Sequence, residues 1–192
     1  MAVLHEKRKY TYEDYCQLPE EVRAEVLDGE ILMSPSPFRK HQSVSREIEF
    51  RLCQWVETHH LGEVYDAPFD VVLSKHNVVQ PDILYISNER RSILTEANVQ
   101  GAPDLVVEIL SPSDKKRDTV KKKEIYEKYG VKEYWIVDPD TETIFVFILE
   151  EKVFQGRGIY NRNQILKSPL LPGFSLMLED VFKSVDCLEP PH

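Results

Sequence analysis

The chain has 192 residues, a net charge of −9 at neutral pH and 30% charged side chains. A chain of this length can bury most of its apolar surface without disulfides. We predict a single domain over residues 1–192, ending in a loose tail at about residues 183–192. The acidic charge argues against a general binder of polyanions, so any DNA must be bound through a local patch, a metal-neutralised cleft or a dimer.

Three widely spaced cysteines, with no CxxC pair among them, argue against a thiolate zinc site or a redox motif. An odd number of cysteines without a disulfide framework suits a reducing compartment. The N-terminus has no apolar stretch typical of a signal peptide, and no apolar run approaches the ~20 residues of a membrane span. We therefore predict a cytoplasmic protein with no membrane partner.

The first 60 residues predict a short helix, a hairpin and a long helix. Thr11 is a candidate helix N-cap, with Asp14 three residues later in a capping-box arrangement. Asp28-Gly29 is a strong turn signal between two short strands. Residues 40–60 carry apolar side chains at helical spacing, namely Val44, Ile48, Leu52, Trp55 and Val56.

The middle of the chain predicts strands separated by turns. Residues 61–87 have the pattern strand, turn, strand, and Pro81 must lie at a strand start, an edge or a bulge. Residues 87–103 are polar and rich in turn-forming residues, with room for one short helix. Residues 104–110, "DLVVEIL", predict a strand that is apolar on both faces and therefore central in its sheet.

The last third predicts one helix followed mainly by strands. Residues 112–129 predict a helix, and Gly130 fits its C-terminal cap. Residues 132–154 predict two strands around an Asp-Pro-Asp turn, and the segment "LPGFSLMLEDVF" adds a strand and a helical turn. The whole pattern indicates a domain of mixed α/β class.

Glu108 lies inside the apolar run of the 104–110 strand. An unpaired ionised carboxylate there would cost several kcal/mol or take up a proton. A metal ion or a lysine would remove that cost. The alternative is that Glu108 lies near the open end of the strand and is solvated.

The following helix offers a partner for Glu108. With a turn of 100° per residue, Lys122 falls on the same face as Asp118, Tyr126 and Tyr129, within about 80° of Asp118. This face must pack on the sheet, so we favour a Lys122 side chain that points to Glu108. The alternative is a simple pair between Asp118 and Lys122 on the helix surface.

Asp82 stands at the start of another apolar run, "VVQPDILYI". Two carboxylates from neighbouring strands, Asp82 and Glu108, can hold a divalent cation through oxygen ligands. The metal would activate water and stabilise a transferring phosphoryl group, and Lys122 would position the water or screen developing charge.

Asp82, Glu108 and Lys122 together resemble the site of the PD-(D/E)XK restriction-endonuclease-like superfamily. More narrowly, the chain from about Tyr10 to Phe182 resembles the Uma-two family of bacterial endonucleases. The resemblance rests on "YTYEDYCQLPE", "AEVLDGEILMSPSP", "VVQPDILYI", "GAPDLVVEILSPS", "RDTVKKKEIYEKYGVKEYWIVDP" and "LPGFSLML". It implies a restriction-endonuclease-like core, a mixed β-sheet flanked by helices, with extra β-strands at the N- and C-terminal parts.

The chain departs from the superfamily pattern at one position. The superfamily carries its lysine two residues after the acid, where this chain has Leu110. The family resemblance places the lysine on the next helix, at Lys122. A long flexible stem can deliver the ammonium group from that position.

The resemblance implies further site residues. Glu25 would be an additional acidic metal ligand, or else a solvent-facing strand residue. His41 would contact phosphate or water, or else be a structural histidine. Asp118 would orient Lys122, and Tyr126 would pack over the site or form a hydrogen bond to it. The implied cofactor is Mg²⁺ or Mn²⁺.

The leading functional hypothesis is a metal-dependent endonuclease that cuts DNA, with phosphate contacts from the basic residues Lys115, Lys116, Arg117 and Lys121. A second hypothesis is a non-catalytic module of the nuclease fold that binds metal, nucleic acid or a protein partner. A third is hydrolysis of a smaller phosphodiester or a nucleotide. We also expect a homodimer, because Phe145, Phe147 and Phe154 offer apolar surface.

Overall fold

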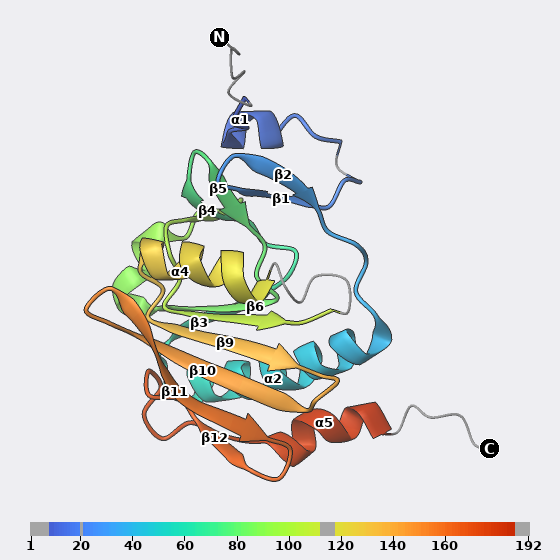
Figure 1. The fold of residues 1–192 in the computed structure, drawn as a ribbon. Coiled ribbons are helices and arrows are strands. Elements are labelled where there is room, and N and C mark those ends of the chain that lie inside the picture. Colours follow the sequence, from blue (N-terminus) through green and yellow to red (C-terminus); the bar gives the residue numbers. More distant parts are fainter. Residues whose placement is uncertain (1–7, 20, 112–117, 187–192) are drawn as a thin grey trace, which may run out of the picture.

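The protein consists of two main β-sheets with helices packed on them (Figure 1), and the computed structural model describes residues 8–19, 21–111 and 118–186. The larger sheet contains six strands, β3 (Gly62–Asp66), β6 (Ile83–Ser87), β8 (Leu105–Ile109), β9 (Glu133–Asp138), β10 (Thr143–Glu150) and β11 (Val153–Asn161). Their order is β11-β10-β9-β8-β6-β3. The β8–β9 pair is parallel and the other pairs are antiparallel, so the sheet is mixed, as predicted.

Two smaller sheets lie toward the ends of the molecule. The second sheet contains β1 (Ala24–Leu27), β2 (Glu30–Met33), β4 (Val71–Ser74), β5 (Asn77–Val79) and β7 (Val99–Gln100), in the order β2-β1-β5-β4-β7. A C-terminal pair is formed by β12 (Ile165–Lys167) and β13 (Ser175–Met177). The β1–β2 hairpin and the β12–β13 pair are the expected additional strands at the N- and C-terminal parts, whereas β4, β5 and β7 come from the middle of the sequence.

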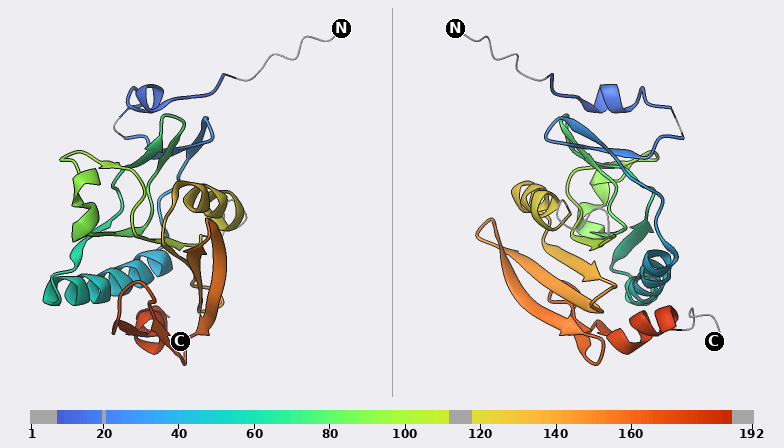
Figure 2. Two further views of the ribbon diagram at one scale, coloured as in Figure 1. Left: turned by 90° about the vertical axis from the view of Figure 1, so that its left-hand side faces the viewer. Right: turned by 45° about the vertical axis from the view of Figure 1, so that its right-hand side comes forward.

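The helices are α1 (Tyr12–Tyr15), α2 (Arg39–Thr58), α4 (Lys123–Tyr129) and α5 (Leu178–Asp186), with a 3₁₀ segment η1 (Asn88–Ile93) and a π-helical segment η2 (Asp118–Lys122). Figure 2 shows α1 and the β1–β2 hairpin at one end of the molecule and α5 toward the other. None of the helices in the described ranges is long and apolar enough to cross a membrane.

Local signals account for the N-terminal elements. Thr11 caps α1, and its backbone N–H in turn donates to the Asp14 carboxylate, which confirms the capping box. Asp28 and Gly29 both have positive φ, 53° and 83°, as a two-residue hairpin turn requires. The predicted hairpin and the long helix after residue 38 are therefore confirmed.

The prediction for residues 61–87 was incomplete, because this segment forms four strands and not two. The strands β4 and β5 form a hairpin that leaves the six-stranded sheet and joins the second sheet. Their apolar side chains, Val71 and Val79 among them, are buried in a hydrophobic core that also contains Val106 and Tyr126. Pro81 lies in the connection between β5 and β6, two residues before β6 begins.

The strand β8 separates two hydrophobic cores, as its apolar faces predicted. Leu105 and Val107 face the core that α2 and α5 cover. Val106 faces the other core, between the six-stranded sheet, α4 and the second sheet. Gly130, at φ 88°, ends α4 as predicted. The predicted start of this helix at residue 112 lies outside the described residues.

The prediction for the C-terminal third was incomplete, because it did not include β11. The helix α5 extends to Asp186, into the tail expected at about residues 183–192, and residues 187–192 lie outside the described part. Of the three phenylalanines expected on a dimer surface, Phe154 is buried, and Phe145 and Phe147 are half-buried. Phe147 and Phe154 stack on Tyr134. The homodimer stays a prediction.

Two buried carboxylates fasten the six-stranded sheet to its surroundings. Asp104 accepts hydrogen bonds from the Ser87 backbone N–H and from the Lys132 ammonium group, at 2.8 and 2.7 Å. Glu133 accepts from the indole N–H of Trp135 and from the Ser168 hydroxyl. The second bond ties the C-terminal strand pair to β9.

Candidate active site

A cavity lies where the six-stranded sheet meets the second sheet. Its walls include Glu25 from β1, Asp82 just before β6, Glu108 from β8 and Lys122 from η2. These residues come from four separate parts of the sequence. The structure therefore brings the predicted acids and the predicted lysine to one place.

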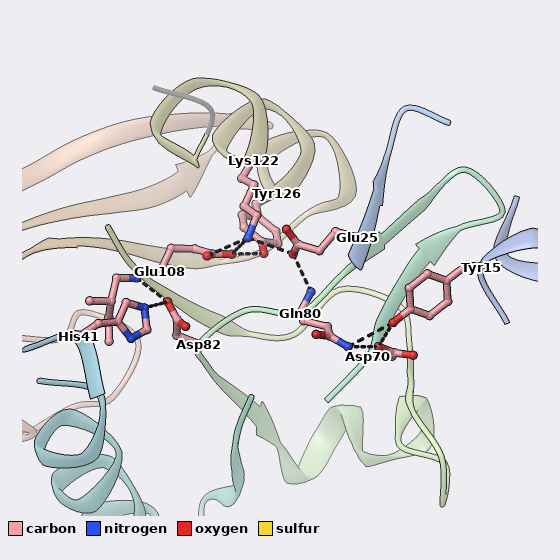
Figure 3. A network of polar contacts seen from close by, with 10 residues as sticks. Tyr15, Glu25, His41, Asp70, Gln80, Asp82, Glu108, Lys122 and Tyr126 are labelled. Atoms are coloured by element: carbon pink, nitrogen blue, oxygen red, sulfur yellow. Dashed lines mark hydrogen bonds and ion pairs between the residues drawn. The ribbon is translucent and has the colours of Figure 1, made fainter. Parts of the chain in front are cut away.

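Lys122 lies between two buried carboxylates, as Figure 3 shows. Its ammonium nitrogen is 3.0 and 3.1 Å from the two oxygens of Glu108 and 3.0 Å from Oε1 of Glu25. All three side chains are at most 6% exposed. The lysine thus neutralises the glutamate inside the apolar strand, as the helical face predicted.

Tyr126 completes this group from α4. Its hydroxyl donates to Oε1 of Glu108 at 2.5 Å. Burial, followed by the negative charges of Glu108 and Glu25, raises the pKa of Tyr126 well above its ordinary value. Tyr126 is therefore a neutral hydrogen-bond donor, which fits its predicted supporting place. Asp118 lies in η2, and its side chain is outside the described part.

Asp82 has different partners. Its Oδ2 accepts from the backbone N–H of Ile109 at 2.7 Å and lies 3.2 Å from Nε2 of His41. Because a carboxylate only accepts hydrogen bonds, this contact requires the proton on Nε2 of His41. His41 therefore binds the predicted metal-ligating acid, where the sequence suggested contact with phosphate or water.

A family model described as "Putative restriction endonuclease", Uma2, matches residues 11–179. The chain belongs to the Uma2 family. This confirms the resemblance to the Uma-two family seen in the sequence. A search of curated proteins found no match.

A solved structure from Anabaena variabilis ATCC 29413, described as a "putative nuclease belonging to DUF820", has the same fold as this Uma2 member. The TM-score is 0.77 at 22% identity, over 91% of this chain and 98% of the other. Together with the mixed sheet and its flanking helices, this likeness confirms the expected fold class.

Gln80, which the sequence analysis missed, connects the Uma2 cavity to the N-terminal helix α1. Its backbone N–H donates to Oε1 of Glu25 at 2.8 Å. Its side-chain amide donates to Oδ1 of Asp70 at 2.8 Å and to the Tyr15 hydroxyl at 3.1 Å (Figure 3). Burial and the hydrogen bond to Asp70 raise the pKa of Tyr15, so its hydroxyl stays protonated. The one available signal was the position of Gln80 directly before Pro81-Asp82.

Of the basic residues predicted to contact phosphate, the structure describes Lys121, and this residue does not line the cavity. Lys121 points away and pairs with the exposed Glu30 at 3.3 Å. The other three, Lys115, Lys116 and Arg117, lie outside the described residues. Arg23, which the sequence analysis did not single out, does line the cavity. It stands one residue before β1 and two before Glu25.

The acids of the cavity suit a hard divalent cation by their chemistry. Asp82, Glu108 and Glu25 supply carboxylate oxygens, the ligand type that Mg²⁺ and Mn²⁺ prefer. Across the described ranges, however, no three His, Cys, Asp or Glu side chains are grouped as a ready metal site. Lys122 contacts Glu25 and both oxygens of Glu108, whereas Asp82 lies outside this group and contacts His41 and the Ile109 N–H.

Proposed function

We propose that this protein is a metal-dependent endonuclease that hydrolyses phosphodiester bonds in DNA at the cavity of Asp82, Glu108 and Lys122. The observation that carries the proposal is the buried contact of the Lys122 ammonium group with both oxygens of Glu108, beside Asp82. Membership of a family described as restriction endonucleases supports the same reaction.

Each residue has a distinct task in this proposal. Asp82 and Glu108 hold the divalent metal, with Glu25 as a further carboxylate. When bound, the metal supplies an activated water and stabilises charge on the phosphoryl group. Lys122 holds positive charge in a dry part of the cavity, where it acts more strongly than in water.

The supporting residues keep the acids in position. His41 and the backbone N–H of Ile109 both bind Oδ2 of Asp82, which fixes the orientation of this carboxylate. Tyr126 and Lys122 fix Glu108 in the same way. Such preorganisation matters because a site loses rate when its groups must be reoriented during the reaction.

One observation favours a second candidate, a nuclease-fold module that binds without turnover. In the part of the chain that the structure describes, the three acids do not form a ready metal cluster, and Lys122 pairs with two of them. A module of this kind would bind nucleic acid or a protein partner and leave the phosphodiester intact.

Calorimetry and a cleavage panel together test the proposal. The wild-type protein is expected to bind Mn²⁺ or Mg²⁺, and Asp82→Asn to lose that binding. Cleavage of plasmid, single-stranded DNA and RNA is then compared for wild type, Glu108→Gln and the matched control Glu57→Gln, an exposed acid at the far end of α2. Glu108→Gln should lose about 100-fold or more in rate, and Glu57→Gln should not change.

The outcomes separate the candidates. Metal binding without cleavage of any substrate favours the non-catalytic module. Absence of metal binding at millimolar concentration refutes the metal site. Cleavage that survives both Asp82→Asn and Glu108→Gln comes from another site or another protein and refutes the assignment of these residues.

A further inference from the structure

Phe38 forms part of the wall of the same cavity and is 62% exposed. Single exposed apolar residues are common on proteins and by themselves indicate nothing. The position of Phe38 is what distinguishes it, because this residue lines a cavity whose other walls carry Glu25, Asp82 and Glu108. An aromatic surface beside such acids is suited to a ligand that has both a flat apolar part and a phosphate.

The backbone holds Phe38 firmly beside the reactive groups. Phe38 is the N-cap residue of α2, and His41, which contacts Asp82, is the third residue of that helix. Phe38 itself is extended, with φ −74° and ψ 160°. The helix that follows is anchored by buried residues such as Val44. Phe38 therefore stands three residues before His41, whose contact orients Asp82.

Arg23 supplies a positive charge on the same cavity. Its side chain is half-buried and lines the cavity. Within the described ranges, its guanidinium group has neither an ion pair nor a side-chain hydrogen bond, unlike Lys121, which pairs with Glu30. Its donors are thus available to an anion, and a planar guanidinium matches the oxygens of a phosphate group.

We infer that Phe38 and Arg23 bind an unpaired nucleotide of a single-stranded DNA segment, with the base stacked on the Phe38 ring and a phosphate held by Arg23. This inference rests on the proposed function and specifies its substrate class. In a duplex, both faces of each base are covered by the neighbouring bases, so the ring can stack only on an unpaired or extruded base. The preferred substrate is therefore a single strand, a flap or a frayed end.

Binding is tested without metal, so that the result does not depend on turnover. Single-stranded and duplex oligonucleotides of equal sequence are titrated in EDTA and followed by fluorescence anisotropy. The single strand carries one 2-aminopurine, whose emission is quenched when it stacks on an aromatic ring. The variants are Phe38→Ala, Phe38→Tyr and Arg23→Gln, and the matched control is Phe50→Ala on α2, which is 55% exposed and does not line the cavity.

Stacking of one base on an aromatic ring predicts the size of the effect. Phe38→Ala should weaken single-strand binding between about 5-fold and about 150-fold and abolish the quenching. Phe38→Tyr should restore both, because it restores the ring. Arg23→Gln should weaken binding and reduce its dependence on salt, and it should keep part of the quenching. Phe50→Ala should bind as the wild type does.

Three results would overturn the inference. The first is equal affinity of wild type and Phe38→Ala for the single strand. The second is an equal loss of affinity for single strand and duplex on Phe38→Ala. The third is no binding of oligonucleotides by the wild type. The failure of the inference is separable from that of the proposed function. Cleavage by the wild type with no effect of Phe38→Ala leaves the nuclease standing and removes the stacking. Stacking in EDTA with no cleavage when metal is added supports the stacking and removes the proposed nuclease activity.

Discussion

Replacing Lys122 by methionine tests the central contact of the site. The change keeps the length and the apolar stem of the side chain but removes the ammonium group between Glu25 and Glu108. Both glutamate side chains are at most 5% exposed, so water cannot readily replace the lost cation. The variant therefore buries two neighbouring negative charges without compensation.

The magnitude follows from the distances in the structure. At 3.0 Å and an effective dielectric constant of ~20, each carboxylate attracts the ammonium group by roughly 5 kcal/mol. The cost of removing these charges from water offsets much of this attraction. The net loss on removing one partner of a buried pair is about 3–5 kcal/mol. For a chain of this size the loss corresponds to a fall in Tm of roughly 6–20 °C.

Thermal and urea unfolding, both in EDTA, measure the effect of Lys122→Met. The double variant Lys122→Met/Glu25→Gln should recover part of the loss, since one of the two uncompensated charges is removed. Lys121→Met is the matched control, because its partner Glu30 is exposed and such a pair contributes about 0.5 kcal/mol or less. A Tm for Lys122→Met within about 2 °C of the control, the shift expected for a loss of only about 1 kcal/mol, would refute the reasoning.

Tyr126→Phe removes the hydroxyl bond to Glu108 and should lower the free energy of unfolding by about 1.5–3 kcal/mol in urea; an unchanged value would show that this bond contributes nothing. Burial opposes ionisation of Asp104, but hydrogen bonds from Lys132 and the Ser87 N–H prevail and lower its pKa below 3.8. The stability that this carboxylate contributes is thus present above pH 3.8 and lost as the pH falls below it. The deficit of Lys132→Met in urea should accordingly be clear at pH 7 and shrink in acid, and a deficit independent of pH would contradict this. Burial raises the pKa of Glu133 above 4.5 despite its hydrogen bonds. The stability that this side chain contributes is therefore present below pH 4.5 and falls as the pH rises through the pKa of the folded protein. Glu133→Gln, which turns an amide N–H₂ toward a donor, should therefore lose about 1–3 kcal/mol, with a larger loss at pH 4 than at pH 8 by thermal unfolding.

Periodicity and local chemistry in the sequence were enough for most of the elements. The apolar spacing of α2, the capping box at Thr11 and the turn at Asp28-Gly29 each act within a few residues, so the sequence alone specifies them. The same holds for the inward direction of Lys122, which follows from its place on an apolar helix face. The cost of burying Glu108 required a cation nearby, and the structure places Lys122 there.

The partners of these residues depended on tertiary structure. Glu25 contacts Lys122 because β1 belongs to the second sheet, which shares the cavity with the six-stranded sheet. The strands β4 and β5 join this second sheet and not the sheet of β3. His41 contacts Asp82 because α2 covers the face of β8. Contacts of this kind join residues far apart in the sequence, and packing and strand register decide them, which no local spacing encodes.

The site therefore divides along the same line. The sequence by itself determined which residues could carry the chemistry. A buried charge such as Glu108 needs compensation, and the family resemblance indicated which residues form the site. Only the tertiary structure decided that Lys122 bridges two acids, that Gln80 links Glu25 to α1, and that Phe38 and Arg23 share the cavity. The physical reason is that charge compensation is a requirement of single residues, whereas a binding surface is a property of how the elements pack.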